Sequence, residues 1–132
     1  MPVYVESVTQ PSPQDHADLA KIYADAPEWL LAPHSSAEEL IEAALTEGSL
    51  IAGRFNDRLL GAALLQRNGS TWRLSHLCVR KLTRKRGVGR RLLEESQRQA
   101  DVAGASLHLA APLDNLEIQA LAARKHLVLK PL

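Results

Sequence analysis

A basic loop with two glycines, lying between a strand-like run and a helix-like run, constrains this chain more than any other segment. Residues 84–89 read Arg-Lys-Arg-Gly-Val-Gly, after Leu77-Cys78-Val79 and before Arg90-Arg91-Leu92-Leu93. A helix N-terminus exposes N–H groups without intrahelical partners and carries partial positive charge, so it binds anions when the preceding backbone can approach closely. Gly87 and Gly89 lack a Cβ that would block an oxygen. The segment therefore predicts a strand, an anion-binding loop and a helix in succession.

Two other phosphate-binding loops are excluded by the spacing of the glycines. A dinucleotide-binding loop needs a third glycine three residues after Gly89, where this chain has Leu92. A triphosphate-binding loop needs Gly-Lys followed by Ser or Thr, which does not occur. The cations of the loop, Arg84, Lys85, Arg86 and Arg90, supply charge-assisted donors where a pyrophosphate or a sugar phosphate would lie.

Residues 79–93 resemble the acyl-CoA-binding motif of the GCN5-related N-acetyltransferase (GNAT) family, Arg/Gln-x-x-Gly-x-Gly/Ala between a splayed strand and a helix. The resemblance implies that loop amides hold the pyrophosphate and that the backbone of the preceding strand hydrogen-bonds the pantetheine arm. The implied cofactor is acetyl-CoA or CoA. The candidate cofactor-binding residues are Leu77, Cys78, Val79, Thr83, Arg84, Lys85, Arg86, Gly87, Val88, Gly89 and Arg90.

A closer likeness exists within that family. Residues 74–80 and 83–89, together with the hairpin segment 51–60, are similar to the PanZ (PanM) proteins, whereas residues 105–132 match poorly. The resemblance implies an acetyl-CoA-binding regulator that promotes self-cleavage of the aspartate 1-decarboxylase proenzyme and senses the CoA level in pantothenate biosynthesis. The polar tip of the segment 54–58, which the general acyltransferase motif does not require, is a candidate contact for that protein partner.

The rest of the chain predicts a mixed sheet with flanking helices. The expected strands are 3–8, 50–55, 59–66, 71–80, 105–110 and 127–129. The expected helices begin near Ser12, at Ser35 or Ser36, after Gly89 and at Asn115, with Gly48 and Gly104 ending two of them. Asn56-Asp57-Arg58 and Asn68-Gly69 predict hairpins, which makes the centre an antiparallel meander. The fold class is α/β (an α+β mixed sheet), as one GNAT-type domain over residues 1–132.

Composition predicts the compartment. The single cysteine, Cys78, has no partner for an internal disulfide, and the N-terminus lacks the features of a secretory signal. No stretch approaches the roughly 18 apolar residues of a membrane span. We therefore expect a soluble, cytoplasmic protein without a membrane partner.

The net charge is only +1, yet seven cations and no acid lie between Arg80 and Arg91. Such a strip also occurs on nucleic-acid-binding or simply solvated surfaces. Glu94 and Glu95 follow within the next turn, and no aromatic residue for base stacking lies nearby. We therefore expect an anionic small molecule and no nucleic acid.

Residues for catalysis are harder to find. Cys78 is more simply a buried apolar side chain than a nucleophile, and the five histidines lack metal-binding spacing. Acetyl transfer needs a base and often an acid, which the GNAT family frequently supplies as a tyrosine on the late helix. The chain has only Tyr4 and Tyr23, while His76 is either a base or a structural strand histidine. We assign no catalytic or metal residue, and expect a non-catalytic regulator; the alternative is an N-acetyltransferase acting on a small amine or a protein amine.

Overall fold

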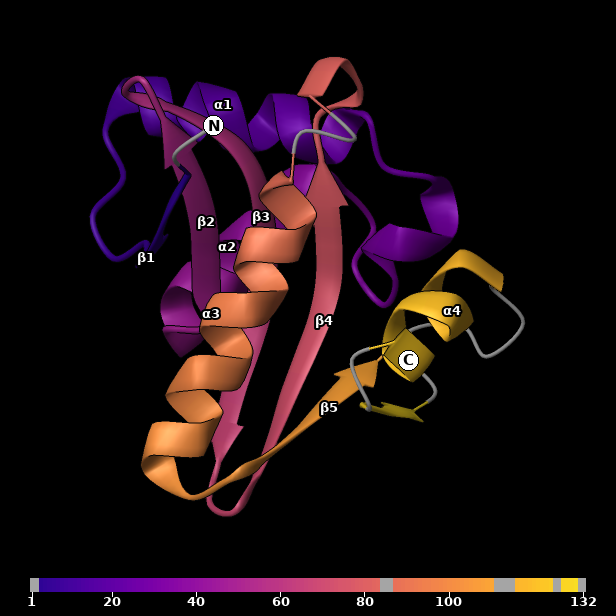
Figure 1. Cartoon of the computed structure of the whole chain (residues 1–132). Coiled ribbons are helices and arrows are strands. Elements are labelled where there is room, and N and C mark those ends of the chain that lie inside the picture. Colours follow the sequence, from indigo (N-terminus) through magenta and orange to yellow (C-terminus); the bar gives the residue numbers. More distant parts are fainter. Residues whose placement is uncertain (1–2, 84–86, 111–115, 125–126, 131–132) are drawn as a thin grey trace.

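The computed structural model describes residues 3–83, 87–110, 116–124 and 127–130. The described strands form one six-stranded sheet in the order β1-β2-β3-β4-β5-β6, as expected for a mixed α/β fold (Figure 1). The strands are β1 (Tyr4–Ser7), β2 (Leu50–Phe55), β3 (Arg58–Asn68), β4 (Thr71–Val79), β5 (Ser106–Ala110) and β6 (Val128–Lys130). The helices are α1 (Pro13–Ala24), α2 (Ala37–Glu47), α3 (Val88–Ala103) and α4 (Leu116–Arg124), with short 3-10 turns η1 (Glu28–Leu31) and η2 (Lys81–Thr83).

The first four strands are antiparallel, which confirms the predicted meander. Asn56 and Asp57 take positive φ angles of 48° and 65°, and together form the two-residue turn between β2 and β3. Consecutive positive φ angles match the twist of the flanking strands, and Asn and Asp tolerate them. Gly69 has a φ of 58° in the next turn. Both hairpins therefore follow from local turn chemistry.

The last two strand pairs are parallel, and a helix makes each crossover. The ladder between β4 and β5 runs from Thr71 beside Ser106 to Leu74 beside Leu109 and ends there. Strand β4 continues to Val79, so the two strands diverge above this ladder, as Figure 1 shows. Within the described strands, the ladder between β4 and β5 does not extend to residues 75–79, whereas the ladder between β3 and β4 continues to Val79. This divergence matches the splayed strand that the resemblance to the GNAT motif predicts.

Helix ends lie where capping chemistry predicts them. The Ser12 hydroxyl accepts the Asp15 N–H at 3.0 Å and the Ser36 hydroxyl accepts the Glu39 N–H at 3.1 Å, so Ser36 rather than Ser35 caps α2. Gly48 and Gly104 end α2 and α3 in the left-handed conformation. No helix in the described part of the chain has the length and apolar content to cross a membrane.

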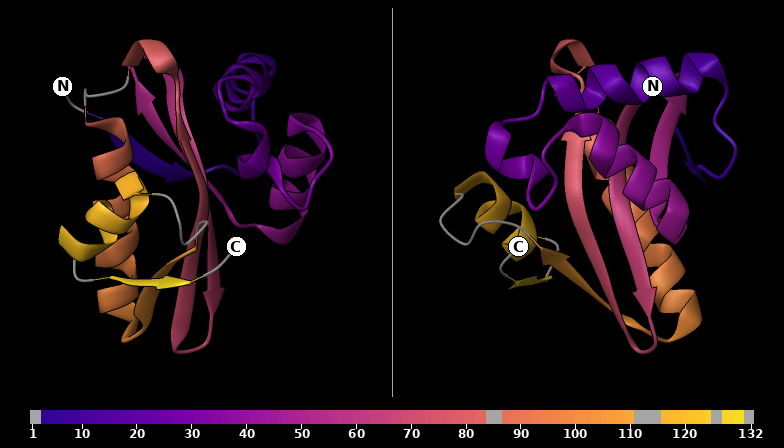
Figure 2. Two further views of the ribbon diagram at one scale, coloured as in Figure 1. Left: turned by 90° about the vertical axis from the view of Figure 1, so that its right-hand side faces the viewer. Right: turned by 180° about the vertical axis from the view of Figure 1, so that it is seen from behind.

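The sheet separates two apolar cores. One lies against α1 and α2 and includes Leu19, Ile22 and Leu40, whereas the other lies against α3 and includes Leu74 and Leu92. The edge-on view in Figure 2 shows α1 and α2 on one face of the sheet, with α3 and α4 on the other. Because η2 follows closely after the end of β4, the described part of the loop before α3 lies at the end of the sheet where β4 diverges from β5.

Candidate functional site

A β-bulge in β4 lies at the start of the diverging segment. Ala62 of β3 is opposite Cys78 and Leu64 is opposite Ser75, so three steps along β4 match two steps along β3. The bulge contains His76, which has a φ of 55°. This left-handed conformation is costly for a residue with a Cβ. A bulge bends its strand and increases its twist. The bend accounts for the way β4 turns from β5.

Tertiary hydrogen bonds hold the bulge in place. The buried Tyr23 hydroxyl of α1 donates to the His76 carbonyl at 2.9 Å. His76 Nε2 lies 2.7 Å from the Ala32 carbonyl, and Nδ1 lies 2.8 Å from the Ser75 hydroxyl. Because a carbonyl only accepts, Nε2 carries the proton and Nδ1 accepts from Ser75. Both ring nitrogens are thus engaged within the fold.

The protonation state of these two groups follows from their burial. Desolvation lowers the pKa of His76 below its ordinary value, with a smaller opposing effect from the Ala32 carbonyl. Burial raises the pKa of Tyr23 well above its ordinary value. His76 is therefore neutral and Tyr23 protonated near pH 7, in roles that fasten α1 and its following loop to β4. These contacts favour a structural role for His76. A general base needs a ring nitrogen that is available to substrate, and both nitrogens of His76 already have partners within the fold.

The N-terminus of α3 differs from those of α1 and α2. Its N-cap is Gly87 in the left-handed conformation, with a φ of 84° and no side chain to accept from the helix amides. The N–H groups of the first turn, from Val88 onward, have no partners within a helix. A Cβ built at Gly89 would have only ordinary contact, 3.5 Å, with Val79 Cγ2. The first turn of α3 therefore lies beside the diverging end of β4 and suits an anion.

Two strand glycines position that first turn, and the sequence analysis did not identify them. Gly53 and Gly61 face each other across β2 and β3, and Val88 packs over both. A Cβ would lie 3.2 Å from Val88 Cγ1 at Gly53 and 2.8 Å from it at Gly61. A glycine inside a strand often marks a close approach by another part of the chain. This rule could have identified Gly53 and Gly61 from the sequence.

The basic strip is partly neutralised in three dimensions. The Asp25 carboxylate accepts the Lys81 N–H at 3.0 Å and lies 3.7 Å from Arg80 Nε, while Glu94 lies 3.4 Å from Arg90 Nε. The Thr83 hydroxyl donates to the Arg80 carbonyl at 3.1 Å, which makes it a local brace of η2. Arg84, Lys85 and Arg86 lie outside the described residues.

The candidate strand residues divide between the two faces of the sheet. Cys78 is buried against α1, and its thiol donates to the Ile22 carbonyl at 3.3 Å. Leu77 and Val79 pack toward the α3 core. This arrangement fits Cys78 as a small buried side chain. Among the residues described, no group of His, Cys, Asp and Glu is arranged to hold a metal ion.

The β2–β3 hairpin is fastened to α1 through its arginines. Arg54 pairs with Asp15 at 3.1 Å and with Glu6 at 2.7 Å, and Arg58 pairs with Asp18 at 2.7 Å. The Asp18 carboxylate also accepts the Leu59 N–H at 3.1 Å. These guanidinium groups therefore serve the fold. The exposed tip of the hairpin consists of Asn56 and Asp57.

Comparison with known proteins assigns the family. The family model described as "Acetyltransferase (GNAT) domain, PanZ" matches residues 2–128. The PanD regulatory factor of Salmonella typhimurium is 42% identical over 85 residues, and that of Escherichia coli is 40% identical over 84 residues. Each alignment covers 64% of this chain and 58% of the relative, so the chain matches less than two thirds of either relative's length.

The fold comparison agrees with the family assignment. The PaiA N-acetyltransferase from Thermoplasma acidophilum, solved in complex with coenzyme A, superposes with a TM-score of 0.71 at 16% identity, over 95% of this chain and 89% of that one. The predicted fold class and the predicted family are confirmed. This chain belongs to the PanZ family of GNAT domains.

Proposed function

We propose that this chain is an acetyl-CoA-binding regulator of aspartate decarboxylase (PanD) maturation, acting in the cytoplasm as one domain over residues 1–132. The family match and the relatives' name, PanD regulatory factor, support the role. One structural observation carries the proposal: the first turn of α3, with no side chain at its N-cap, lies beside the end of β4 that has left β5.

The proposed cofactor site combines these two features. The amides at Gly87, Val88 and Gly89 would face the pyrophosphate, because the glycines leave room for its oxygens. The backbone of Leu77, Cys78 and Val79 would bind the pantetheine arm along the diverging edge of β4. Thr83, Arg84, Lys85, Arg86 and Arg90 complete the proposed site as the loop that flanks the phosphates.

The contacts within the fold support binding without catalysis. Two acid–base groups at the bulge are engaged within the fold: the Tyr23 hydroxyl donates to the His76 carbonyl, and the His76 ring contacts Ala32 and Ser75. A group that relays a proton to substrate has to reach that substrate, directly or through one water. These two groups are instead committed to holding β4 and α1 together.

A cleavage assay tests the proposed function. Purified PanD proenzyme is incubated alone, with this chain, with acetyl-CoA, and with both, and the cleaved subunits are quantified by gel electrophoresis over time. We expect the combination of chain and acetyl-CoA to accelerate cleavage. Identical time courses in all four mixtures would contradict the proposal.

The second candidate function, N-acetyl transfer to a small amine or a protein amine, rests on the fold shared with a solved N-acetyltransferase. A thiol-release assay against a panel of amines distinguishes it from the first. Steady turnover with any amine favours the enzyme, whereas binding of acetyl-CoA without thiol release favours the regulator.

A further inference from the structure

Part of one sheet face has no helix over it among the residues that the structure describes. The rear view in Figure 2 shows α1 and α2 over the upper parts of β2, β3 and β4, while no described helix lies in front of the lower parts of β3 and β4 or of β5. Side chains alternate between the two faces along a strand, and Leu107, Leu109, Leu127 and Leu129 face the α3 core. The residues between them therefore face the open side.

Strand register brings these residues together. Gln66 pairs with Arg73, Arg73 with His108, and His108 with Val128, which places them in one row across four strands. Lys130 follows Val128 by two residues and lies on the same side. We call this set the open sheet face: Gln66, Arg73, His108, Val128 and Lys130.

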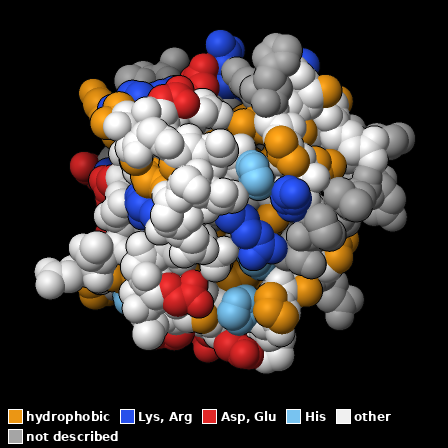
Figure 3. Space-filling view, turned by 90° about the horizontal axis from the view of Figure 1, so that it is seen from below, with side chains coloured by type: hydrophobic (Ala, Val, Ile, Leu, Met, Phe, Trp, Pro, Cys, Tyr) orange, Lys and Arg blue, Asp and Glu red, His pale blue; other side chains and the backbone are white. Residues whose placement is uncertain are grey.

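The open sheet face is cationic. Arg73 is half-buried, and its NH1 donates to the neutral Gln66 side chain at 3.3 Å. No carboxylate forms an ion pair with Arg73 or Lys130 within the described residues. By contrast, Arg54 pairs with two carboxylates and Arg58 with one. Figure 3, seen from the end of the β3–β4 hairpin, shows Lys or Arg and His side chains gathered near the middle of that view. A half-buried arginine oriented by an amide suits a carboxylate ligand.

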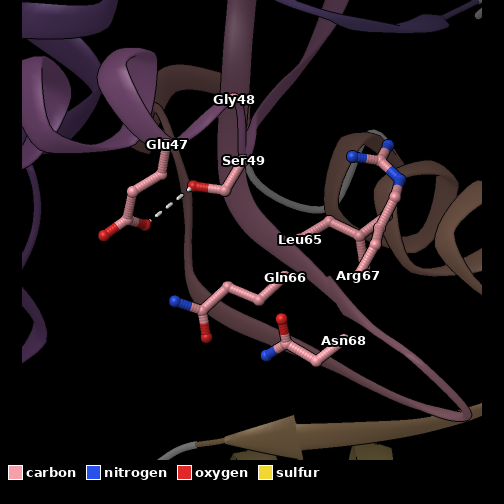
Figure 4. A pocket seen from close by; sticks show the side chains of 7 residues that line it. All are labelled: Glu47, Gly48, Ser49, Leu65, Gln66, Arg67 and Asn68. Carbon is pink, nitrogen blue, oxygen red and sulfur yellow. Dashed lines mark hydrogen bonds between the residues drawn. The ribbon is translucent and has the colours of Figure 1, made fainter.

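An acid and two amides border this face. Figure 4 shows Gln66 and Asn68 in one pocket with Glu47 and Ser49, and the side chains of Gln66 and Asn68 extend to the side of β3 on which Glu47 lies. Because the Gln66 oxygen accepts from Arg73, its amide nitrogen remains a donor for a bound chain. The charge across the surface therefore changes from negative at Glu47 to positive at Arg73 and Lys130.

We propose that the open sheet face docks an extended acidic segment of a protein partner, with its carboxylates on Arg73 and Lys130. This goes beyond the proposed function, because it needs no cofactor and no cleavage event. A nucleic acid is disfavoured because none of the five residues of the face is a Phe, Tyr or Trp that would stack on bases. A membrane surface is disfavoured because Val128 is its one large apolar side chain.

The test is an NMR titration of the full chain, labelled with ¹⁵N, with a capped hexaglutamate peptide. Capped hexaglutamine and a six-nucleotide oligothymidine serve as the uncharged and the nucleic-acid probes. We expect hexaglutamate to shift the amides of Arg73, His108 and Lys130, and to bind more weakly as salt rises. Arg73→Gln should weaken it roughly tenfold, the loss expected for one charge-assisted hydrogen bond.

Arg98→Gln is the matched control. It removes the same charge from α3, on the opposite face of the sheet, where Arg98 is exposed and paired with Glu95. Hexaglutamate affinity should be unchanged in this variant. The proposal is overturned if both variants weaken binding equally, if the shifted amides lie elsewhere, or if oligothymidine binds as tightly as hexaglutamate.

Discussion

Val88 packs directly onto the bare backbone of Gly61: a methyl group at position 61 would lie 2.8 Å from Val88 Cγ1 and 3.3 Å from the Cys78 carbonyl. The contact joins the first turn of α3 to β3 and to the diverging end of β4. The position of the proposed phosphate-binding turn therefore depends on a glycine more than twenty residues away in the sequence.

Gly61→Ala should destabilise the domain by about 1–3 kcal/mol, the usual cost of overpacking, and should weaken acetyl-CoA binding by displacing α3. Urea unfolding and calorimetric titration measure the two effects. Val88→Ala in the same chain removes the clash, so the double variant should be more stable than the sum of the two single losses predicts. Strict additivity would show that the contact does not position α3.

Gly89→Asp should abolish acetyl-CoA binding without unfolding the domain, because it places a side chain and a negative charge where the pyrophosphate would lie. Gly89→Ala separates the two effects: its Cβ has only ordinary contact with Val79, and alanine gains up to about 1 kcal/mol of helix propensity over glycine. We expect unchanged or higher stability with weaker binding, by thermal unfolding and calorimetry. Wild-type affinity in both variants would refute the loop assignment.

Gly87→Asp is a less informative test of the same loop. Gly87 has a φ of 84°, a conformation that strains any residue with a Cβ, so loss of binding would mix backbone strain with loss of the anion site. The structure therefore favours Gly89 as the position to mutate.

The ion pairs between α1 and the β2–β3 hairpin predict that the folded domain loses stability at acid pH. Burial tends to raise the pKa of Asp18, but hydrogen bonds from Arg58, the Leu59 N–H and Gln14 outweigh it and hold that pKa below 3.8. A hydrogen bond from Arg54 is the main cause of the lowered pKa of Asp15. A depressed carboxyl pKa contributes stability above pH 3.8 that is lost as pH falls through the folded value.

Asp18→Asn should therefore cost about 1–3 kcal/mol at pH 7 and should reduce the fall in stability below pH 4. Urea unfolding of both proteins between pH 2 and pH 7, values chosen to bracket the ordinary aspartate range, measures the difference. Asp101→Asn is the control: this residue lies at the exposed end of α3, and among the described residues its carboxylate accepts a hydrogen bond from the Gln97 side chain alone. Parallel pH profiles for the wild type and Asp18→Asn would contradict the account.

The exposed hairpin tip predicts a variant that separates partner recognition from cofactor binding. Replacing Asn56 and Asp57 together by glycine keeps the positive φ angles and removes both side chains. We expect acetyl-CoA affinity to stay within twofold, about 0.4 kcal/mol, while acceleration of PanD proenzyme cleavage is lost. Ser70→Gly, in the turn at the opposite end of β3, should leave both unchanged. Full acceleration by the double-glycine variant would show that the side chains of the hairpin tip do not contribute to the partner contact.

Much of the fold follows from local chemistry that is readable in the sequence. Asn56-Asp57 and Asn68-Gly69 indicate the hairpins, Ser12 and Gly48 mark helix ends, and the change from an antiparallel meander to strands separated by helices indicates the mixed sheet. Each of these signals depends on residues within a few positions of one another, so no tertiary information is needed.

The geometry of the site depends on longer-range contacts. The bulge at His76 is held by Tyr23 and Ala32, and the first turn of α3 depends on Gly53 and Gly61. These partners lie from more than twenty to more than fifty residues away in the chain. The sequence predicts an anion site at the glycine loop, but the position of the first turn of α3 beside the diverging edge of β4 requires the register of the sheet.

The most direct test of the central claim is proenzyme cleavage with wild-type chain and with Gly89→Asp, each with and without acetyl-CoA. The account predicts that acetyl-CoA makes the wild type an accelerator of cleavage, and that Gly89→Asp, folded by circular dichroism, has no effect in either condition. Acceleration by Gly89→Asp equal to that by the wild type would contradict the claim that acetyl-CoA at the N-terminus of α3 controls PanD maturation.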